Sequence, residues 1–270
     1  MKASYKKYIL NFKQPSGTSR GILTEKESWF ILLEKDGKQG IGECGLLRGL
    51  SMDDVENYEQ ILQWTCLNIH LGLHLLYEEL HKFPSIQFGL EMAFKSLESD
   101  DDFVLFPSEF TDGKKAIPIN GLIWMGSKDF MKNQIKSKIE AGFNCIKMKI
   151  GAIDFETELE ILQAIRNDYS KGDIELRVDA NGAFKADEAL EKLKRLSEFD
   201  LHSIEQPIKQ GQIQEMADLC QRTPLPIALD EELLGIIDVT KNCKPYISSV
   251  ASVISVGLSI FLFKIQIFSH

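Results

Sequence analysis

Charged side chains interrupt a series of short apolar segments in the second half of this chain. Strands that are buried on both faces of a parallel sheet are normally continuous apolar runs, and a charge within one is costly unless it is paired or binds a metal. These charges therefore constrain the fold and the chemistry together. The segments concerned are 145–150 (CIKMKI), 174–180 (IELRVDA), 202–208 (HSIEQPI) and 226–230 (PIALD).

Amphipathic segments of helical length separate these strands. Such alternation is typical of parallel βα units, in which the carboxyl ends of the strands share one face. The sequence therefore predicts a parallel α/β domain, for which a closed eight-stranded barrel is one solution. The predicted helices lie near 128–141, 154–168, 186–198 and 211–221, and a first strand is expected at 117–123.

The first hundred residues have a different pattern. Three alternating or apolar runs, with Asp36 and Gly37 as a hairpin turn between the last two, predict an antiparallel meander followed by two helices. We place the domain boundary near residue 110, after a polar stretch. The expected strands are 3–12, 27–35 and 39–44, the helices 52–83 and 84–97, and the domains an α+β domain at 1–110, a partial barrel at 111–238 and an atypical apolar tail at 239–270.

The composition narrows the kinds of molecule that this protein is expected to bind. The net charge of −9 argues against nucleic acids and anionic membranes, and favours a small molecule or a metal ion. The five cysteines form no C-x-x-C pair, and the amino terminus has no signal-peptide pattern, so we expect a cytoplasmic protein without a zinc site. The sequence does not indicate an oligomeric state.

Three carboxylates recur at equivalent depth in successive strands. The steps from Lys149 to Asp179, from Asp179 to Glu205 and from Glu205 to Asp230 are 30, 26 and 25 residues. Side chains alternate along a strand, so Lys147 shares the face of Lys149. Converging carboxylates repel one another unless a divalent cation neutralises them, and oxygen ligands favour Mg²⁺ or Mn²⁺.

Two lysines beside such a cation would have lowered pKa values, in the range useful for a general base. The pattern therefore predicts a site that abstracts a proton. The alternative is that these charges are structural salt bridges. The identity of the third metal ligand also stays open, because Asp230, Glu231 and Glu232 are consecutive and any of them could be the ligand.

Taken together, these motifs resemble the enolase superfamily, muconate-lactonizing subgroup, from about residue 8 to about residue 238. Within it, further segments are most similar to the o-succinylbenzoate synthases. The superfamily motifs are Lys147-Met-Lys149, Arg177-Val-Asp179-Ala-Asn181-Gly, Ile204-Glu205-Gln206-Pro207 and Ala228-Leu-Asp230-Glu. The further segments are Gly17-Thr-Ser-Arg20-Gly21, Gly42-Glu-Cys-Gly45, Arg48-Gly-Leu-Ser51 and Pro118-Ile-Asn-Gly121.

The resemblance implies a capping α+β domain on a modified (β/α)-barrel and a Mg²⁺-dependent lyase of menaquinone biosynthesis acting on a small carboxylate. Lys149 would remove the proton α to the carboxylate and return it to the leaving hydroxyl, so that water departs, while Lys147 tunes Lys149. The implied metal ligands are Asp179, Glu205 and Asp230, and the implied substrate-binding residues are Arg177, Asn181 and Arg20. The alternatives are a dipeptide epimerase or N-acylamino acid racemase of the same superfamily, and an inactive remnant.

The resemblance ends near residue 240. The family has another lysine on strand six. Extending the steps of 25 to 30 residues beyond Asp230 places it at 255–260, where this sequence has no lysine. Lys244 and Lys264, which are 14 and 34 residues beyond Asp230, do not fit these steps. We therefore expect an incomplete barrel with about five strands, and a gene frameshifted or truncated after about residue 238. The uncharged run 247–263 is shorter than the roughly 20 residues of a membrane span, so we expect no anchor.

A glycine motif gives one further alternative. Residues 40–45 match the G-x-G-x-x-G pattern of dinucleotide-binding proteins. The motif follows a hairpin turn and does not open a helix of a βαβ unit, so we do not expect it to bind a nucleotide.

Overall fold

The computed structural model divides into two compact units, Met1–Ile117 and Pro118–His270. It describes residues 1–18, 21–101, 104–124, 126–235 and 253–255. The division follows Ile117, whereas the sequence-based boundary lies near residue 110. Each unit has its own buried apolar core.

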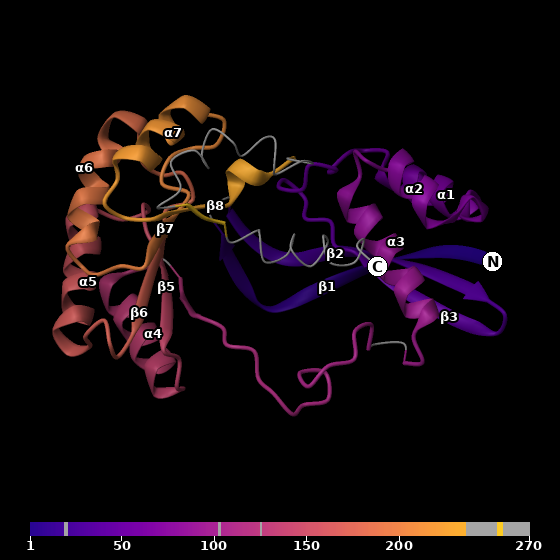
Figure 1. The fold of residues 1–270 in the computed structure, drawn as a ribbon, viewed down its shortest axis with the longest axis horizontal. Helices are drawn as coiled ribbons and strands as arrows, with labels where there is room; N and C mark the ends of the chain where they lie inside the picture. The colour runs from indigo at the N-terminus through magenta and orange to yellow at the C-terminus, as the bar shows by residue number, and fades with distance from the viewer. Residues whose placement is uncertain (19–20, 102–103, 125, 236–252, 256–270) are drawn as a thin grey trace. The chain divides into compact units, whose positions relative to one another are not determined.

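The first unit contains the antiparallel meander that the sequence predicts. Its strands are β1 (Lys2–Thr18), β2 (Gly21–Lys35) and β3 (Lys38–Cys44), hydrogen-bonded in that order (Figure 1). Asp36 and Gly37 have φ angles of 53° and 81°, as a two-residue hairpin turn requires. The turn chemistry therefore fixes the β2–β3 register, which pairs Lys35 with Lys38.

The long helix expected at 52–83 is wrong. The chain instead forms three short helices before α3 (Pro84–Glu98), which agrees with the second expected helix. Gly72, with a φ of 79°, interrupts the helical path, because that value lies outside the right-handed region. The short helices are α1 (Tyr58–Leu67), η1 (Ile69–Leu71) and α2 (Gly72–Glu79).

The glycine motif of β3 serves close packing against α3. A Cβ atom on Gly42 would lie 1.7 Å from the carbonyl oxygen of Gly89, and one on Gly40 would lie 2.2 Å from that of Ala93. Gly89 in turn leaves room for Cys44, whose sulfur would lie 2.3 Å from an added Cβ. These glycines let the helix backbone approach the sheet, which gives the motif a structural role.

Replacing Gly42 with Ala should destabilise the first unit by about 3 kcal/mol or more, because the clashing atom belongs to the helix backbone and cannot rotate away. Gly45→Ala is the matched control, since its nearest neighbour is a flexible lysine nitrogen at 4.0 Å. Urea unfolding followed by circular dichroism measures both. Equal unfolding free energies for the two variants would show that α3 does not pack this closely.

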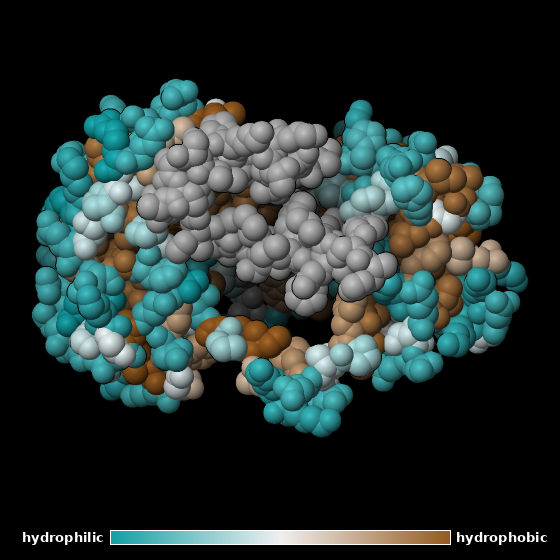
Figure 2. Space-filling model, in the orientation of Figure 1, coloured by the Kyte–Doolittle hydropathy of each residue, from teal (hydrophilic) through white to brown (hydrophobic). Residues whose placement is uncertain are grey.

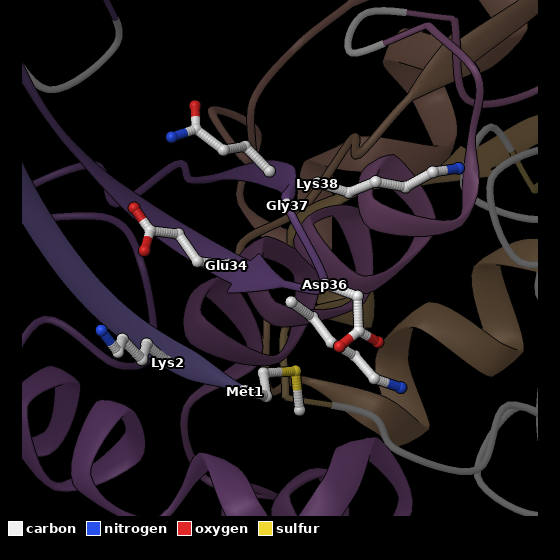
Figure 3. A pocket seen from close by; sticks show the side chains of 8 residues that line it. Met1, Lys2, Glu34, Asp36, Gly37 and Lys38 are labelled. Atoms are coloured by element: carbon white, nitrogen blue, oxygen red, sulfur yellow. The ribbon is translucent and has the colours of Figure 1, made fainter.

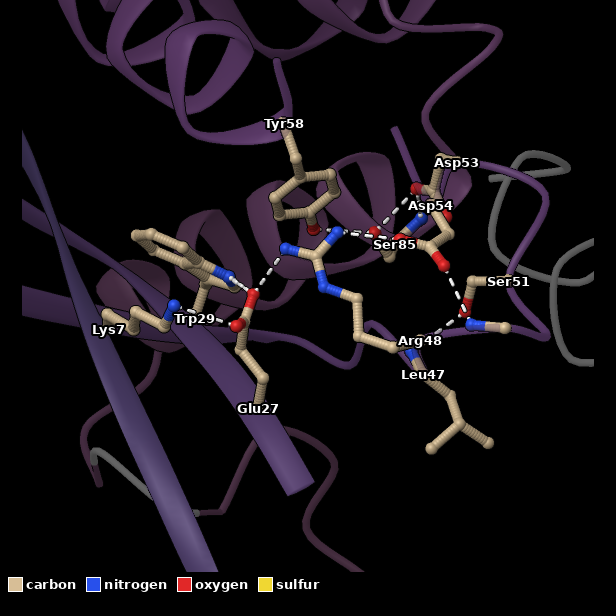
Figure 4. Close-up of polar contacts among 11 residues, drawn as sticks. Lys7, Glu27, Trp29, Leu47, Arg48, Ser51, Asp53, Asp54, Tyr58 and Ser85 are labelled. Atoms are coloured by element: carbon tan, nitrogen blue, oxygen red, sulfur yellow. Dashed lines mark hydrogen bonds and ion pairs between the residues drawn. The ribbon is translucent and has the colours of Figure 1, made fainter. Parts of the chain in front are cut away.

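Arg48 connects the loop after β3 to the sheet (Figure 4). Its guanidinium donates to Glu27 Oε1 and Asp54 Oδ1, both at 2.6 Å. Burial opposes ionisation of Glu27, but hydrogen bonds from Lys7, Trp29 and Arg48 outweigh it and lower the pKa of this carboxyl. The network therefore orders the loop that contains the Arg48-Gly-Leu-Ser51 segment.

The second unit is built from parallel strands in sequential order, β4 to β9. Helices connect them and lie along one face of the strands (Figure 1), and the outer side of α5 and α6 is largely hydrophilic (Figure 2). The strands are β4 (Gly121–Ile123), β5 (Cys145–Lys149), β6 (Glu175–Asp179), β7 (Ser203–Glu205), β8 (Ile227–Leu229) and β9 (Val253–Ser255). The helices are α4 (Lys128–Glu140), α5 (Phe155–Asp168), α6 (Ala186–Ser197), α7 (Ile213–Arg222) and the short η2 (Glu231–Leu233).

Strand β9 adds to the five strands expected from the sequence. Its backbone pairs in parallel with β8, Ala228 opposite Ile254, inside the segment expected to be an atypical tail. The sheet is therefore part of a (β/α)-barrel wall with six strands in the described residues. The rest of the segment 239–270, where the sequence led us to expect a frameshift or truncation, lies outside the described residues. Among the helices that the structure describes, none is long and apolar enough to cross a membrane.

Strand alternation separates the core from the charged side chains. Ile146 and Met148 of β5 are fully buried in the apolar core of this unit, together with Leu176 and Val178 of β6. Lys147, between Ile146 and Met148, therefore lies on the opposite face of the sheet. The same alternation places the predicted site residues on that one face.

Candidate active site

The register of three neighbouring strands brings the predicted site residues into one row. Lys149 pairs with Asp179 across β5 and β6, and Asp179 pairs with Glu205 across β6 and β7. All three lie at the carboxyl ends of their strands, where α/β barrels place their chemistry. Residues spaced 30 and 26 positions apart in the sequence thus become neighbours across the sheet.

Lys147 links two of the carboxylates. Its Nζ donates to Glu205 Oε2 at 2.6 Å and lies 3.3 Å from Asp179 Oδ2. Asp179 is 1% exposed and Glu205 is 7% exposed, so both carboxylates are largely removed from water. A single cation therefore already bridges these two buried carboxylates.

Lys149 is held by Asp179 and Asn181. Its Nζ lies 2.9 Å from Asp179 Oδ2 and 2.7 Å from Asn181 Oδ1. Asn181 has a φ of 44°, and its backbone N–H donates to Asp179 Oδ1 at 3.0 Å. This turn at the end of β6 aims the amide oxygen at the lysine, so Asn181 orients Lys149.

The pKa directions follow from these contacts. Burial would lower the pKa of Lys147, but Asp179 and Glu205 outweigh it and raise that pKa. Burial and the charge of Asp179 raise the pKa of Glu205, although Lys147 opposes the shift. This direction describes the site without a divalent cation, in which Lys147 is itself the counterion.

The three consecutive acids after β8 have different surroundings. Asp230 is exposed, but partial desolvation of its carboxyl, together with the charges of Glu231 and Asp179, raises its pKa. Glu231 is buried; Oε1 accepts from Asn181 Nδ2 at 3.1 Å, and Oε2 has no hydrogen-bond partner among the described residues. Glu232 accepts from the backbone N–H of Gly211 at 3.1 Å, which points to a structural role.

The donor set fits a divalent cation. Asp179 and Glu205 already share one cation, Asp230 is close enough to raise the pKa of Glu205, and Glu231 offers an unpartnered buried oxygen. Within the described residues, no three His, Cys, Asp or Glu side chains stand in a ready-formed metal site. Mg²⁺ bound by Asp179 Oδ2 and Glu205 Oε2 would compete with Lys147 for these two oxygens.

Other predicted residues lie elsewhere. The Arg177 guanidinium is 2.6 Å from Glu175 Oε1 on the same strand, so its ion pair points away from Asp179. Arg20, Lys244 and Lys264 lie outside the described residues. The register of β9 places Ile254 in the row of Glu205 and Ala228.

Another depression, of about 460 Å³, lies at the β2–β3 hairpin of the first unit (Figure 3). Glu34, Lys35, Asp36 and Lys38 line it together with the amino-terminal Met1 and its neighbour Lys2. None of the predicted site residues is among them, and the charged groups are of both signs.

Comparison with known families supports the two-unit division. Residues 2–97 match the family described as MenC, N-terminal domain, and residues 131–245 match the family described as Enolase C-terminal domain-like. The first match lies within the α+β unit, and the second covers β5 to β8, with Lys147 and the three carboxylates. The fold and the site thus define an enzyme of the enolase superfamily, with an α+β domain and a (β/α)-barrel domain.

A relative from Desulfotalea psychrophila, an o-succinylbenzoate synthase, is 43% identical over 87% of this chain and 73% of its own length. This chain belongs to the o-succinylbenzoate synthase family. The crystal structure of MenC from the same organism has a TM-score of 0.79 at 37% identity, covering 94% of this chain and 77% of that one.

More distant relatives include an enzyme with another activity and a second o-succinylbenzoate synthase. The Hydrophobic dipeptide epimerase of Roseobacter litoralis is 23% identical over 86% of this chain and 69% of its own length. The o-succinylbenzoate synthase structure from Thermosynechococcus elongatus, complexed with Mg in the active site, has a TM-score of 0.68 at 23% identity, over 86% of this chain and 69% of that one. At this identity the likeness concerns the fold alone.

Proposed function

We propose that this chain removes water from a cyclohexadiene carboxylate to give o-succinylbenzoate, as a Mg²⁺-dependent lyase of menaquinone biosynthesis. The row of Lys149, Asp179 and Glu205 at the ends of three parallel strands carries this proposal. It places a candidate base next to the carboxylates proposed to hold the metal. Membership of the synthase family and the MenC match of residues 2–97 favour this substrate over a dipeptide.

Asp179, Glu205 and Asp230 are the proposed ligands of Mg²⁺. When bound, the metal would supply positive charge beside the substrate carboxylate, where negative charge develops as the neighbouring proton leaves. The buried positions of Asp179 and Glu205 exclude water and so strengthen every charge interaction there.

Lys149 is the proposed base. Its amine takes the proton α to the carboxylate and then gives it to the departing hydroxyl, so that no net proton is consumed. Asn181 Oδ1, at 2.7 Å, keeps Nζ in place during the transfer. Lys147 is the proposed electrostatic partner, since a second ammonium group nearby favours the neutral form of Lys149. Arg177, Asn181 and Arg20 remain proposed substrate contacts.

Direct assay tests the reaction. Purified chain with Mg²⁺ should convert the cyclohexadiene carboxylate to o-succinylbenzoate, as followed by the loss of diene absorbance. Hydrophobic dipeptides are incubated in parallel and examined for epimerisation. Epimerisation without dehydration would favour the epimerase alternative, and neither reaction would favour the remnant.

Asp179→Asn should weaken Mg²⁺ binding by about 100-fold, because it removes a charged ligand but keeps the shape of the side chain. Isothermal titration with MgCl₂ measures the affinity. The matched control is Asp173→Asn, which removes an exposed carboxylate that bonds only Ser170 among its described hydrogen bonds. Equal Mg²⁺ affinity in the two variants would contradict the proposed ligand.

We also propose that the chain works in the cytoplasm. The four described cysteines are free thiols, and two of them, Cys44 and Cys220, are buried. This supports a reducing compartment. The acidic net charge of −9 supports a small-molecule partner over a nucleic acid.

A further inference from the structure

The glutamine that follows Glu205 is wholly buried and bonded at both ends of its amide. Gln206 is 0% exposed. Its Oε1 accepts from the backbone N–H groups of Asp230 at 3.1 Å and Glu232 at 3.2 Å. Its Nε2 donates to the carbonyl of Ile208 at 3.0 Å and to Glu232 Oε2 at 3.3 Å.

The backbone of the same residue joins β8 to the turn after β6. Gln206 N–H donates to the carbonyl of Ala228 at 2.9 Å, and the N–H of Gly182 donates to the Gln206 carbonyl at 2.7 Å. Its φ is 40°, a left-handed value that is uncommon for a residue other than glycine. This strained turn directs the amide toward the loop after β8 and away from the carboxylate of Glu205.

The two N–H groups that Gln206 accepts lie on either side of Glu231. Fixing both of them fixes the path of the β8–η2 loop at Asp230 and Glu231. Asp230 is a proposed metal ligand, and Glu231 carries the unpartnered buried oxygen. Methionine or leucine at this position would leave both N–H groups without this acceptor, whereas glutamate would place a second carboxylate against Glu232.

We propose that Gln206 is a positioning residue that holds the loop after β8 so that its carboxylates can complete the metal site. This inference rests on the proposed function, because it concerns the ligands of the proposed Mg²⁺. As a positioning residue, Gln206 contacts neither substrate nor metal and acts through the backbone of residues 230–232.

Mg²⁺ titration of Gln206→Met tests the proposal. Methionine keeps the length and volume of the side chain but cannot accept the two N–H groups. We expect the Kd for Mg²⁺ to rise by about 10-fold to 100-fold, the usual effect of removing a group that supports a metal ligand. An unchanged Kd in the folded variant would overturn the proposal.

Gln87→Met is the matched control. Gln87 is another buried glutamine, in α3 of the first unit, and its Nε2 donates to the carbonyl of Tyr77 at 2.6 Å. We expect this variant to lose stability but keep the wild-type Kd for Mg²⁺. A purely structural role for Gln206 would give the two variants the same Kd.

Amide hydrogen exchange, measured by NMR without Mg²⁺, tests the proposal if Gln206→Met does not fold or if the wild type binds no Mg²⁺. If Gln206→Met does not fold, the wild-type amides of Asp230 and Glu232 should be as protected as those of the sheet, and rapid exchange would overturn the proposal. If the wild type binds no Mg²⁺, the proposed function fails, while faster exchange of these amides in Gln206→Met would still support the positioning role.

Discussion

Replacing Lys149 with Met is expected to lower kcat/KM for the loss of water by about 10³-fold to 10⁴-fold, the contribution of a well-placed general base. The variant should stay folded, because Asp179 keeps Lys147 at 3.3 Å as a counterion. Steady-state kinetics with the cyclohexadiene carboxylate measures the loss. Exchange of the substrate α-proton with D₂O should disappear in the same variant.

Lys171→Met is the control for Lys149→Met. Lys171 is an exposed lysine whose ion pair with Asp200 lies on the surface of the same unit. Its replacement should leave kcat/KM unchanged. If Lys149→Met kept activity within tenfold of the wild type, another group would have to be the base.

Replacing Lys147 with Met should destabilise the Mg²⁺-free chain by about 3–5 kcal/mol at neutral pH, because it leaves Glu205 as a buried carboxylate without its cation. Saturating Mg²⁺ should restore much of this loss, since the metal replaces the missing charge. Urea unfolding with and without MgCl₂ measures both effects.

The pH dependence of this deficit has a definite sign. The pKa of Lys147 is raised in the folded state, so its stabilisation is complete below the ordinary lysine value and is lost only as the pH rises through the folded value. The pKa of Glu205 is also raised, and removing Lys147 raises it further. Protonation of Glu205 then removes the unpaired buried charge in Lys147→Met, so the loss of unfolding free energy in this variant should shrink as the pH falls.

Lys128→Met is the control for Lys147→Met. Lys128 forms an exposed ion pair with Glu160, and such pairs contribute about 0–1 kcal/mol. Its effect should depend on neither Mg²⁺ nor acid pH. A Lys147→Met deficit of the same small size would mean that Glu205 is not dependent on a counterion.

Local patterns predicted most elements of the fold. The hairpin at Asp36 and Gly37 and the helices α4 to α7 follow from turn chemistry and helical periodicity, both of which act between near neighbours. The helix expected at 52–83 was wrong because apolar periodicity does not register the end of α1 at Asn68 or the positive φ of Gly72. Strand β9 was not expected as a strand, since its three residues carry no distinctive pattern and depend on pairing with β8.

The candidate site, like the fold, was predicted only in part from the sequence. The sequence spacing of Lys149, Asp179 and Glu205 predicted that these residues lie close together, and the strand register makes them neighbours. The role of Gln206 had no signal in the sequence beyond its place in a motif. Its partners lie 24 and 26 residues away, and nothing local specifies that an amide will meet two backbone N–H groups.

By itself, the sequence determined the succession of βα units, the face that carries the charges and the family to which the chain belongs, because period and spacing are properties of the covalent chain. Only the tertiary structure decided which cation neutralises which carboxylate. That choice raises the pKa of Lys147, because the charges of Asp179 and Glu205 outweigh the effect of burial in the low dielectric of the site. It also separated Asp230, Glu231 and Glu232, whose burial and hydrogen bonds come from strands far apart in the sequence.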